Sequence, residues 1–280
     1  MNATAVELDV IVTAKVSMPY GYVYRAQGNP VKRVLTAISP FGEALEAPCT
    51  VFVVRHPSAG TILIDTGMHR DAREHPRRDF GIPLSLMFRG LKPADEPFDE
   101  QLRALDIEPD SVERVVMTHL HLDHTSGMRL LPNAKFTASD AEWAATQGRF
   151  PAVKGYVPHH LPAVSRMQLL DFDREGEPYA TFERTIDLLG DGTIRLISTP
   201  GHSAGHLSVL LRLADGGQAL LVGDAAYTLR NIQEEILPIL TDDDATARRS
   251  VGTIKAFALA NPQTIIVPSH DPDAWRALAD

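Results

Sequence analysis

The chain has 280 residues, of which 44% are hydrophobic and 22% charged, which suits a soluble globular protein with one large α/β domain or two small ones. No linker marks a domain boundary, so a single domain over residues 1–280 is expected. The formal net charge is −9 and no run of Lys or Arg occurs, which argues against nucleic acid as a partner. No window holds the roughly 18 apolar residues of a membrane span. The first ten residues lack the pattern of a secretory signal, so a cytoplasmic location without a membrane partner is expected.

Strands are predicted for much of the first half of the chain. Residues 6–16 alternate loosely and carry Val, Ile and Thr, as strands do. Short apolar runs predict further strands at residues 35–38, 50–55 and 60–64. The last run ends in the turn composition Asp65-Thr66-Gly67. The single cysteine, Cys49, cannot form an internal disulfide and is expected to be a small core residue rather than a nucleophile.

Three stretches are harder to interpret. Residues 18–22 form an aromatic loop that is rich in turn residues. Residues 69–97 mix charges with scattered large apolar side chains, which fits a lid or cavity wall as well as an ordinary surface insertion. His159 and His160 lie in a Pro-flanked loop with no strand ahead of them, so they are expected at the surface or in a pocket wall and not as metal ligands.

A dense group of polar residues follows the strand predicted at residues 112–117. His119, His121, Asp123 and His124 occupy four of six consecutive positions. In an extended segment His119 and His121 share a face, while Asp123 and His124 turn away toward a second point. Burying such groups without partners would cost about 2–7 kcal/mol each, whereas imidazole and carboxylate are ligands of zinc and similar metals. The sequence therefore predicts a divalent metal site here.

The second half of the chain is predicted to alternate helices with strands. Helices are predicted at residues 98–105, 127–131 and 245–260 and from Ser139 onward, and strands at residues 134–137, 193–197, 219–222 and 264–268. His202 follows the 193–197 strand in a loop whose glycines permit a tight turn. Asp224 and His270 come at the ends of the two later strands.

These motifs resemble those of one family. His119-x-His121-x-Asp123-His124 resembles the signature of the metallo-β-lactamase superfamily, and the resemblance extends from about Val51 to His270. The stretch from Thr199 to His206 is similar to the family's third motif, and the Asp65 turn to its early Asp-x-Gly turn. The resemblance implies a four-layer αββα sandwich. It also implies that Asp65 holds the ligand loop without binding metal and that His206 is structural.

The resemblance further implies two divalent cations as cofactors. The first would be bound by His119, His121 and His202, the second by Asp123, His124 and His270, and Asp224 would bridge them. Zinc is the expected metal, with manganese, iron and cobalt as alternatives, because sites that combine imidazole with carboxylate accept all four.

Tyr227 lies three residues after Asp224. A tyrosine there resembles the N-acyl-homoserine lactonase branch, which implies a metal-dependent hydrolase that degrades bacterial quorum signals. A hydroxide between the metals would attack the lactone carbonyl and Tyr227 would stabilise the oxyanion. Asp123 would pass a proton to the leaving oxygen. The aromatic loop at residues 18–22 would help to shape the substrate cavity.

Alternatives to this function stay open at the level of the sequence. The nearest is a related dimetal hydrolase that acts on thioesters or phosphotriesters. The complete ligand set disfavours a metal-stabilised binding protein, and the acidic charge disfavours a nuclease. A homodimer is also open, because dimers occur among the proteins that the chain resembles. The sequence does not identify the acyl chain of a lactone substrate.

Overall fold

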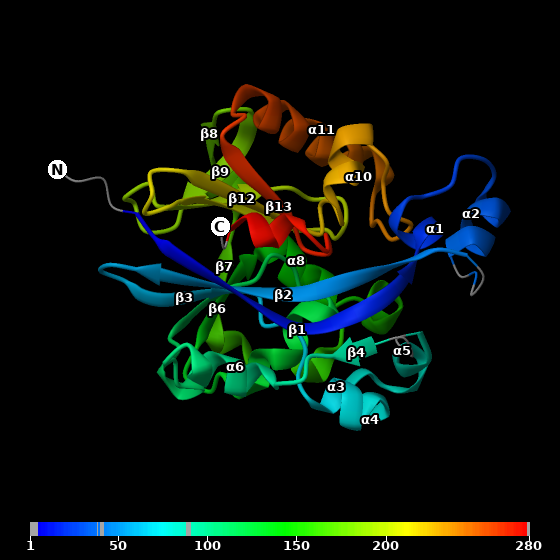
Figure 1. Cartoon of the computed structure of the whole chain (residues 1–280), viewed down its shortest axis with the longest axis horizontal. Coiled ribbons are helices and arrows are strands. Elements are labelled where there is room, and N and C mark those ends of the chain that lie inside the picture. Colours follow the sequence, from blue (N-terminus) through cyan, green and yellow to red (C-terminus); the bar gives the residue numbers. More distant parts are fainter. Residues whose placement is uncertain (1–4, 38, 40–41, 88–90, 279–280) are drawn as a thin grey trace.

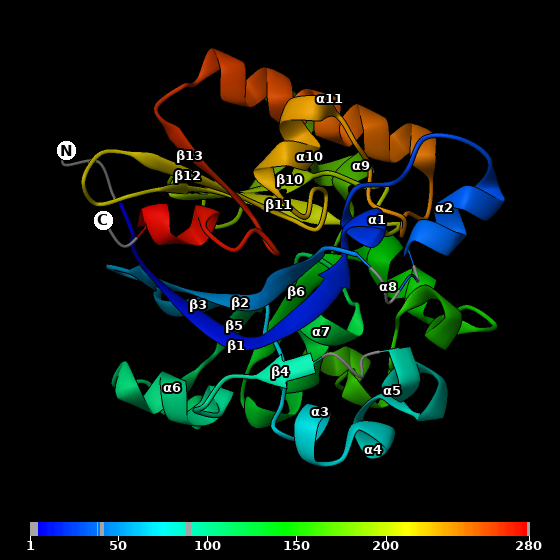
Figure 2. The same ribbon diagram turned by 45° about the vertical axis from the view of Figure 1, so that its right-hand side comes forward.

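Two β-sheets pack face to face and carry helices on their outer sides (Figure 1). The computed structural model of the chain describes residues 5–37, 39, 42–87 and 91–278. Helices α10 (Leu229–Glu234) and α11 (Asp244–Ala260) cover one sheet, and α6 (Phe98–Ala104) covers the other (Figure 2). This is the four-layer αββα sandwich that the sequence predicts.

The first sheet has seven strands in the order β4-β1-β2-β3-β5-β6-β7. The pairs β4–β1, β1–β2 and β2–β3 are antiparallel, whereas the pairs β3–β5, β5–β6 and β6–β7 are parallel. The bounds are β1 (Glu7–Pro19), β2 (Ala44–His56), β3 (Gly60–Ile64), β4 (Leu91–Pro93), β5 (Arg114–Val116), β6 (Lys135–Ser139) and β7 (Met167–Leu170).

The second sheet has six strands in the order β13-β12-β11-β10-β9-β8. Only the β12–β13 pair is parallel within this sheet as the structure describes it. The bounds are β8 (Glu177–Tyr179), β9 (Phe182–Asp187), β10 (Ile194–Ser198), β11 (Leu207–Arg212), β12 (Gln218–Gly223) and β13 (Thr264–Pro268).

Shorter helices connect the strands. The remaining α-helices are α1 (Tyr20–Val23), α2 (Pro30–Ala37), α3 (Asp71–Glu74), α4 (Pro76–Phe80), α5 (Ile82–Met87), α7 (Leu122–Thr125), α8 (Asp140–Thr146) and α9 (Phe172–Glu175). The 3₁₀ helices are η1 (Pro109–Ser111), η2 (Ser126–Leu130), η3 (Pro151–Lys154), η4 (Pro158–His160), η5 (Val164–Arg166) and η6 (Ala274–Leu278). None of the helices within the described ranges is long and apolar enough to cross a membrane.

Alternating side chains on the strands build the three apolar layers of the sandwich. Leu63 of β3 packs with the α6 side, whereas its neighbour Ile62 packs between the sheets. In β12, Leu221 points between the sheets and Leu220 packs against α11. Successive strand residues point to opposite faces, so strands that are apolar on both faces must lie between two covered layers. Cys49 is buried within β2, as expected of a core residue.

The carboxyl ends of five strands meet at one edge of the sandwich. The polar positions predicted from the sequence lie within a few residues of the ends of β3, β5, β10, β12 and β13. Because both sheets contribute strands that end here, segments far apart in the sequence are brought to a single point. Sites of layered α/β proteins commonly lie at such an edge.

Three element predictions are wrong. The loop predicted at residues 18–22 is instead the end of β1 followed by helix α1. The strand predicted at residues 35–38 is helical up to Ala37 as part of α2, and Ile38 lies outside the described residues. Pro30 opens this helix, and the Asn29 side chain accepts a hydrogen bond from Lys32 N at 2.9 Å, so local capping overrides the apolar run. The segment predicted as a helix at residues 127–131 is a 3₁₀ helix and not an α-helix: η2 covers Ser126–Leu130 and Leu131 caps it.

Candidate metal centre

The polar residues of the loop after β5 belong to two separate groups of candidate metal ligands. His119 and His121 lie in the extended part of this loop, and His121 has an extended backbone with ψ of 160°. Helix α7 then begins at Leu122 and turns the backbone sharply, which carries Asp123 and His124 away from His121. The division that the sequence predicts is therefore made by the start of a helix.

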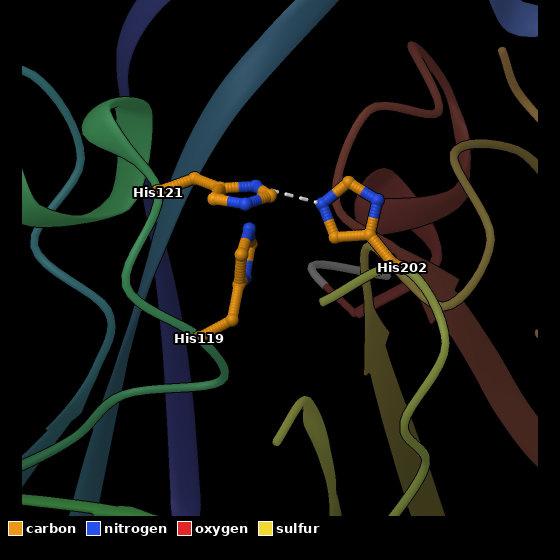
Figure 3. A group of neighbouring side chains, drawn as sticks. All are labelled: His119, His121 and His202. Atoms are coloured by element: carbon orange, nitrogen blue, oxygen red, sulfur yellow. Dashed lines mark hydrogen bonds between the residues drawn. The ribbon is translucent and has the colours of Figure 1, made fainter. Parts of the chain in front are cut away.

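The first group of candidate ligands consists of three buried histidines, His119, His121 and His202 (Figure 3). The His202 Nε2 and His121 Nδ1 atoms are 2.9 Å apart, and the ring of His119 lies 4.6 Å from that of His121. Burial lowers the pKa of both His121 and His202 to about 3, and it holds the pKa of His119 well below its usual range. All three rings are therefore neutral at pH 7, the form that binds metals.

The second group consists of four residues that are also buried: Asp123, His124, Asp224 and His270. The Nε2 atom of His270 lies 3.5 Å from Asp123 Oδ2 and 3.3 Å from Asp224 Oδ2. Burial disfavours the charged form of His124, but Asp65, Asp123 and Asp224 raise its pKa well above the usual value. Nearby carboxylates thus determine the direction of the His124 pKa shift in the second group, whereas burial determines the histidine pKa shifts in the first.

The carboxylate of Asp224 lies close to histidines of both groups. Its Oδ2 atom lies 3.4 Å from His202 Nε2 and 3.8 Å from His119 Nε2 in the first group. Its Oδ1 atom lies 3.4 Å from His124 Nε2 in the second group. Burial opposes its charged form, but His270 and His124 hold the pKa of Asp224 well below the usual range. The position is that of a carboxylate shared between two cations.

Three donor atoms of this cluster are buried without a hydrogen-bond partner among the described residues. They are His119 Nε2, His124 Nε2 and Asp224 Oδ1. Such unpaired polar atoms are rare in folded proteins because each costs free energy. In each group the donor atoms lie within 4.8 Å of one another. Nitrogen and oxygen donors so placed fit two divalent cations, which would satisfy the unpaired atoms.

Hydrogen bonds to Nδ1, the ring nitrogen that faces away from the donor group, orient the His124 and His270 rings. His124 Nδ1 lies 2.8 Å from Asp65 Oδ2, and His270 Nδ1 lies 2.8 Å from the Pro48 carbonyl oxygen. Such bonds set the tautomer and leave Nε2 free to bind a metal. Asp65 also accepts hydrogen bonds from the backbone N–H and the hydroxyl of Thr118. The expectation that Asp65 holds the ligand loop is confirmed.

His206 lies outside the donor set and positions Asp224. Its Nε2 atom accepts a hydrogen bond from Asp224 N at 2.9 Å, and its Nδ1 atom lies 3.0 Å from the Thr199 hydroxyl. Gly223 permits this contact, because a Cβ atom there would lie 2.6 Å from His206 Nε2. The structural role expected for His206 is confirmed.

Comparison with known proteins identifies the family. The metallo-beta-lactamase superfamily model matches residues 45–270. The chain belongs to this superfamily. The N-acyl homoserine lactonase AttM of Rhizobium radiobacter is 35% identical to it over 240 residues, which make up 84% of this chain and 86% of AttM.

Two solved structures of the superfamily share the fold. One is a mutant of AiiA from B. thuringiensis with N-decanoyl-L-homoserine bound at the active site; the TM-score is 0.75 at 22% identity, over 98% of this chain and 96% of that one. The other is AidC, a dizinc quorum-quenching lactonase in complex with a product, with a TM-score of 0.64 at 15% identity, over 97% and 90%.

Tyr227 lies against the metal centre of this superfamily member. It is 2% exposed, and its ring lies 5.0 Å from that of His270 and 5.7 Å from that of His202. Tyr22, in helix α1, stacks on it at 6.2 Å and shares a hydrogen bond with it. Burial, Tyr22 and Asp224 raise the pKa of Tyr227 well above the usual value, so its hydroxyl keeps the proton and can donate it in a hydrogen bond.

The other histidines fall outside the centre. His159 is exposed, as expected. His160 is buried, not on the surface: its Nδ1 atom lies 3.2 Å from the Thr125 hydroxyl and its Nε2 atom 3.0 Å from the Asp79 carbonyl oxygen. Neither belongs to the donor groups formed by the described residues.

The segment 69–97 is folded into α3, α4, α5 and β4, apart from residues 88–90, which lie outside the described residues. Its buried residues Phe80 and Leu84 belong to the same apolar cluster as Tyr227. This segment is therefore packed into the core beside Tyr227 and is not a surface insertion alone. Its role as a lid or cavity wall stays a prediction. The sequence offers no motif for the roles of Tyr22 and Asp79, because both depend on contacts between distant segments.

Replacing Asp65 by asparagine is expected to weaken metal binding about 10- to 100-fold, as loss of a carboxylate behind a ligating imidazole does. Asparagine tolerates the left-handed backbone at this position, where φ is 62°, but its amide N–H would face His124 Nδ1. Metal content after dialysis measures the effect. The control is Asp191→Asn, which alters the remote pair of Asp191 with His56. Equal metal affinity in both variants would contradict the role assigned to Asp65.

Proposed function

We propose that the chain is a metal-dependent hydrolase that opens the lactone ring of N-acyl homoserine lactones. The observation that carries this proposal is a buried phenol, Tyr227, packed against a complete set of seven metal-donor residues. The 35% identity to the N-acyl homoserine lactonase AttM over most of both chains supports the same substrate class.

The donor set suggests how the cations are bound. His119, His121 and His202 would bind the first, Asp123, His124 and His270 the second, and Asp224 both. Zinc is the metal that we propose, because sites of imidazole and carboxylate with bonded far-side nitrogens are typical of it. Two bound cations would supply a nucleophilic water of lowered pKa and a Lewis acid for the carbonyl oxygen.

The protein groups would carry out the rest of the reaction. As water adds to the lactone carbonyl carbon, negative charge develops on the carbonyl oxygen, and the Tyr227 hydroxyl donates a hydrogen bond to it. The ring C–O bond then breaks and the ring oxygen leaves as an alkoxide. Asp123, 8% exposed at the rim of the second group, is placed to pass the proton of the attacking water to that oxygen. The product is an N-acyl homoserine, whose carboxyl group releases a proton at neutral pH.

A small cavity offers access to the centre. It has a volume of about 200 Å³ and is lined by His121, His202, Val153 and Leu240, among others. Val153 is 83% exposed, so an apolar side chain stands at the mouth of this cavity. An acyl chain would be received by such a surface because its burial is favourable.

The test compares substrate classes. We expect the metal-loaded protein to convert N-acyl homoserine lactones into products heavier by one water in mass spectra. Its kcat/KM for lactones should exceed that for a thioester or a phosphotriester. Faster turnover of either of those two classes would overturn the proposed substrate and favour the related hydrolase.

Replacing Tyr22 by phenylalanine is expected to lower kcat/KM for the lactone about 2- to 10-fold, the effect of one neutral hydrogen bond. The variant keeps the stacked ring and removes only the hydroxyl that orients Tyr227. Steady-state kinetics measure the change. Tyr20→Phe alters an exposed neighbour in α1 and serves as the control. If both variants match the unaltered protein, Tyr22 does not orient Tyr227.

A further inference from the structure

A buried carboxylate links the two loops that carry the first group of histidines. Glu142 lies in the first turn of α8 and is fully buried. Its Oε1 atom accepts a hydrogen bond from Leu120 N at 3.0 Å. Its Oε2 atom accepts bonds from the Ser203 hydroxyl at 2.7 Å and from Gly205 N at 2.9 Å. One side chain thus joins the loop after β5 to the loop after β10.

The donors on both loops are next to metal-donor residues. Leu120 stands between His119 and His121, and Ser203 directly follows His202. Fixing Leu120 N and the Ser203 hydroxyl to a single carboxylate therefore fixes the distance between the two loops. That distance decides whether the three imidazoles meet at one point.

The surrounding backbone is shaped for this contact. A Cβ atom at residue 205 would lie 2.2 Å from Glu142 N, so only glycine allows α8 to approach the loop this closely. Tyr156 adds a further link: its hydroxyl is hydrogen-bonded to Glu142, its backbone forms a bridge with His121, and its ring lies 5.0 Å from the His121 ring. Glu142 is thereby connected to all three histidines of the first group.

The second group is held by a different carboxylate. Asp65 bonds to His124 and to Thr118, whose hydroxyl lies 3.1 Å from His119 Nδ1, so this carboxylate supports both groups. Among the described residues, the hydrogen bonds of Glu142 go to the loops of the first group and not to a donor of the second. We propose that Glu142 is a positioning residue that selectively sets the affinity of the first metal. This inference rests on the metal assignment in the proposed function.

Replacing Glu142 by glutamine keeps the size of the side chain but removes an acceptor. In one orientation the amide NH₂ group would face Gly205 N–H, and in the other it would face Leu120 N–H. Either orientation leaves a buried backbone donor without an acceptor, and relief requires the two loops to move apart. The bonds around the second group are untouched.

The experiment measures stepwise zinc binding to the full-length chain by equilibrium dialysis. Nitrogen-15 spectra of labelled histidines identify which rings respond at each step. The unaltered protein should bind two zinc ions tightly. Glu142→Gln should bind one tightly, with shifts of His124 and His270, and the other about 10- to 100-fold more weakly, with shifts of His119, His121 and His202. Asp65→Asn, in contrast, should weaken the step that shifts His124 and His270.

The outcomes separate this inference from the proposed function. If the unaltered protein does not bind two zinc ions, the metal assignment itself fails. If it does, and Glu142→Gln binds both ions as tightly or loses both equally, the selective role of Glu142 is overturned. Ser203→Ala removes only one of the bonds and provides a milder second variant. It should weaken the same first-group step by a few-fold, and an unchanged affinity there would count against the inference.

Discussion

Replacing Asp224 by asparagine is expected to reduce lactone hydrolysis at least about 10³-fold. Two like unit charges 4 Å apart repel by about 4 kcal/mol at an effective dielectric constant of 20, and about 1.4 kcal/mol corresponds to a factor of ten. Asp224 is the carboxylate whose two oxygens face both donor groups, so its negative charge opposes that repulsion. Asparagine keeps the shape and removes the charge.

The measurement for Asp224→Asn combines kcat/KM with metal content. We expect fewer than two metal ions per chain together with the loss of activity. Asp187→Asn is the matched control, because Asp187 bonds only to Gly190 N and Gly192 N in a remote turn among the hydrogen bonds described. A variant at position 224 with full activity would show that the centre does not need a shared carboxylate.

Replacing Tyr227 by phenylalanine is expected to lower kcat for lactones about 10²- to 10³-fold, as loss of one donor to a developing oxyanion does. Metal content and KM should change little, because the hydroxyl acts on charge that appears only in the transition state. The ring contacts with His202 and His270 are kept in the variant.

Kinetics at saturating lactone separate this role from a packing role. Tyr179→Phe, in β8, removes a hydroxyl far from the centre and should leave kcat unchanged. If Tyr227→Phe raised KM with kcat intact, the tyrosine would bind the ground state and would not stabilise the transition state.

The sequence predicted which residues would lie near one another at the site, because they follow strands with clear apolar patterns. His119, His202, Asp224 and His270 lie a few residues after the ends of β5, β10, β12 and β13, and these carboxyl ends meet at one edge. The position of these residues after strands therefore indicated that they would lie close together in the fold. The match of the family model to residues 45–270 agrees with this prediction. A single domain over residues 1–280, a cytoplasmic location and a homodimer stay predictions.

Residues that act through tertiary contacts could not be predicted. The helix from Ser139 onward is found as α8, but the contact of Glu142 with Leu120 depends on how closely α8 approaches two distant loops. His160 reads as a loop residue in the sequence, yet it is buried because Asp79 arrives from another segment. Such residues carry no local pattern, since their partners are 20 to 80 positions away.

The failure at residues 35–38 has a different cause. Val34 and Leu35 are apolar enough to suggest a strand, but both are exposed in α2. Asn29 and Pro30 supply the start signals of a helix, and these local signals decide the conformation. An apolar run alone does not distinguish a buried strand from an exposed helix.

The central claim is that a two-metal centre opens a lactone. Proton release from an N-acyl homoserine lactone, followed in weakly buffered solution, tests it directly when the protein carries zero, one or two zinc ions per chain. The account predicts one proton released per lactone consumed, fast only with two ions bound and absent in Asp224→Asn. Release at the same rate from the metal-free protein, or none from the two-metal protein, would contradict the account.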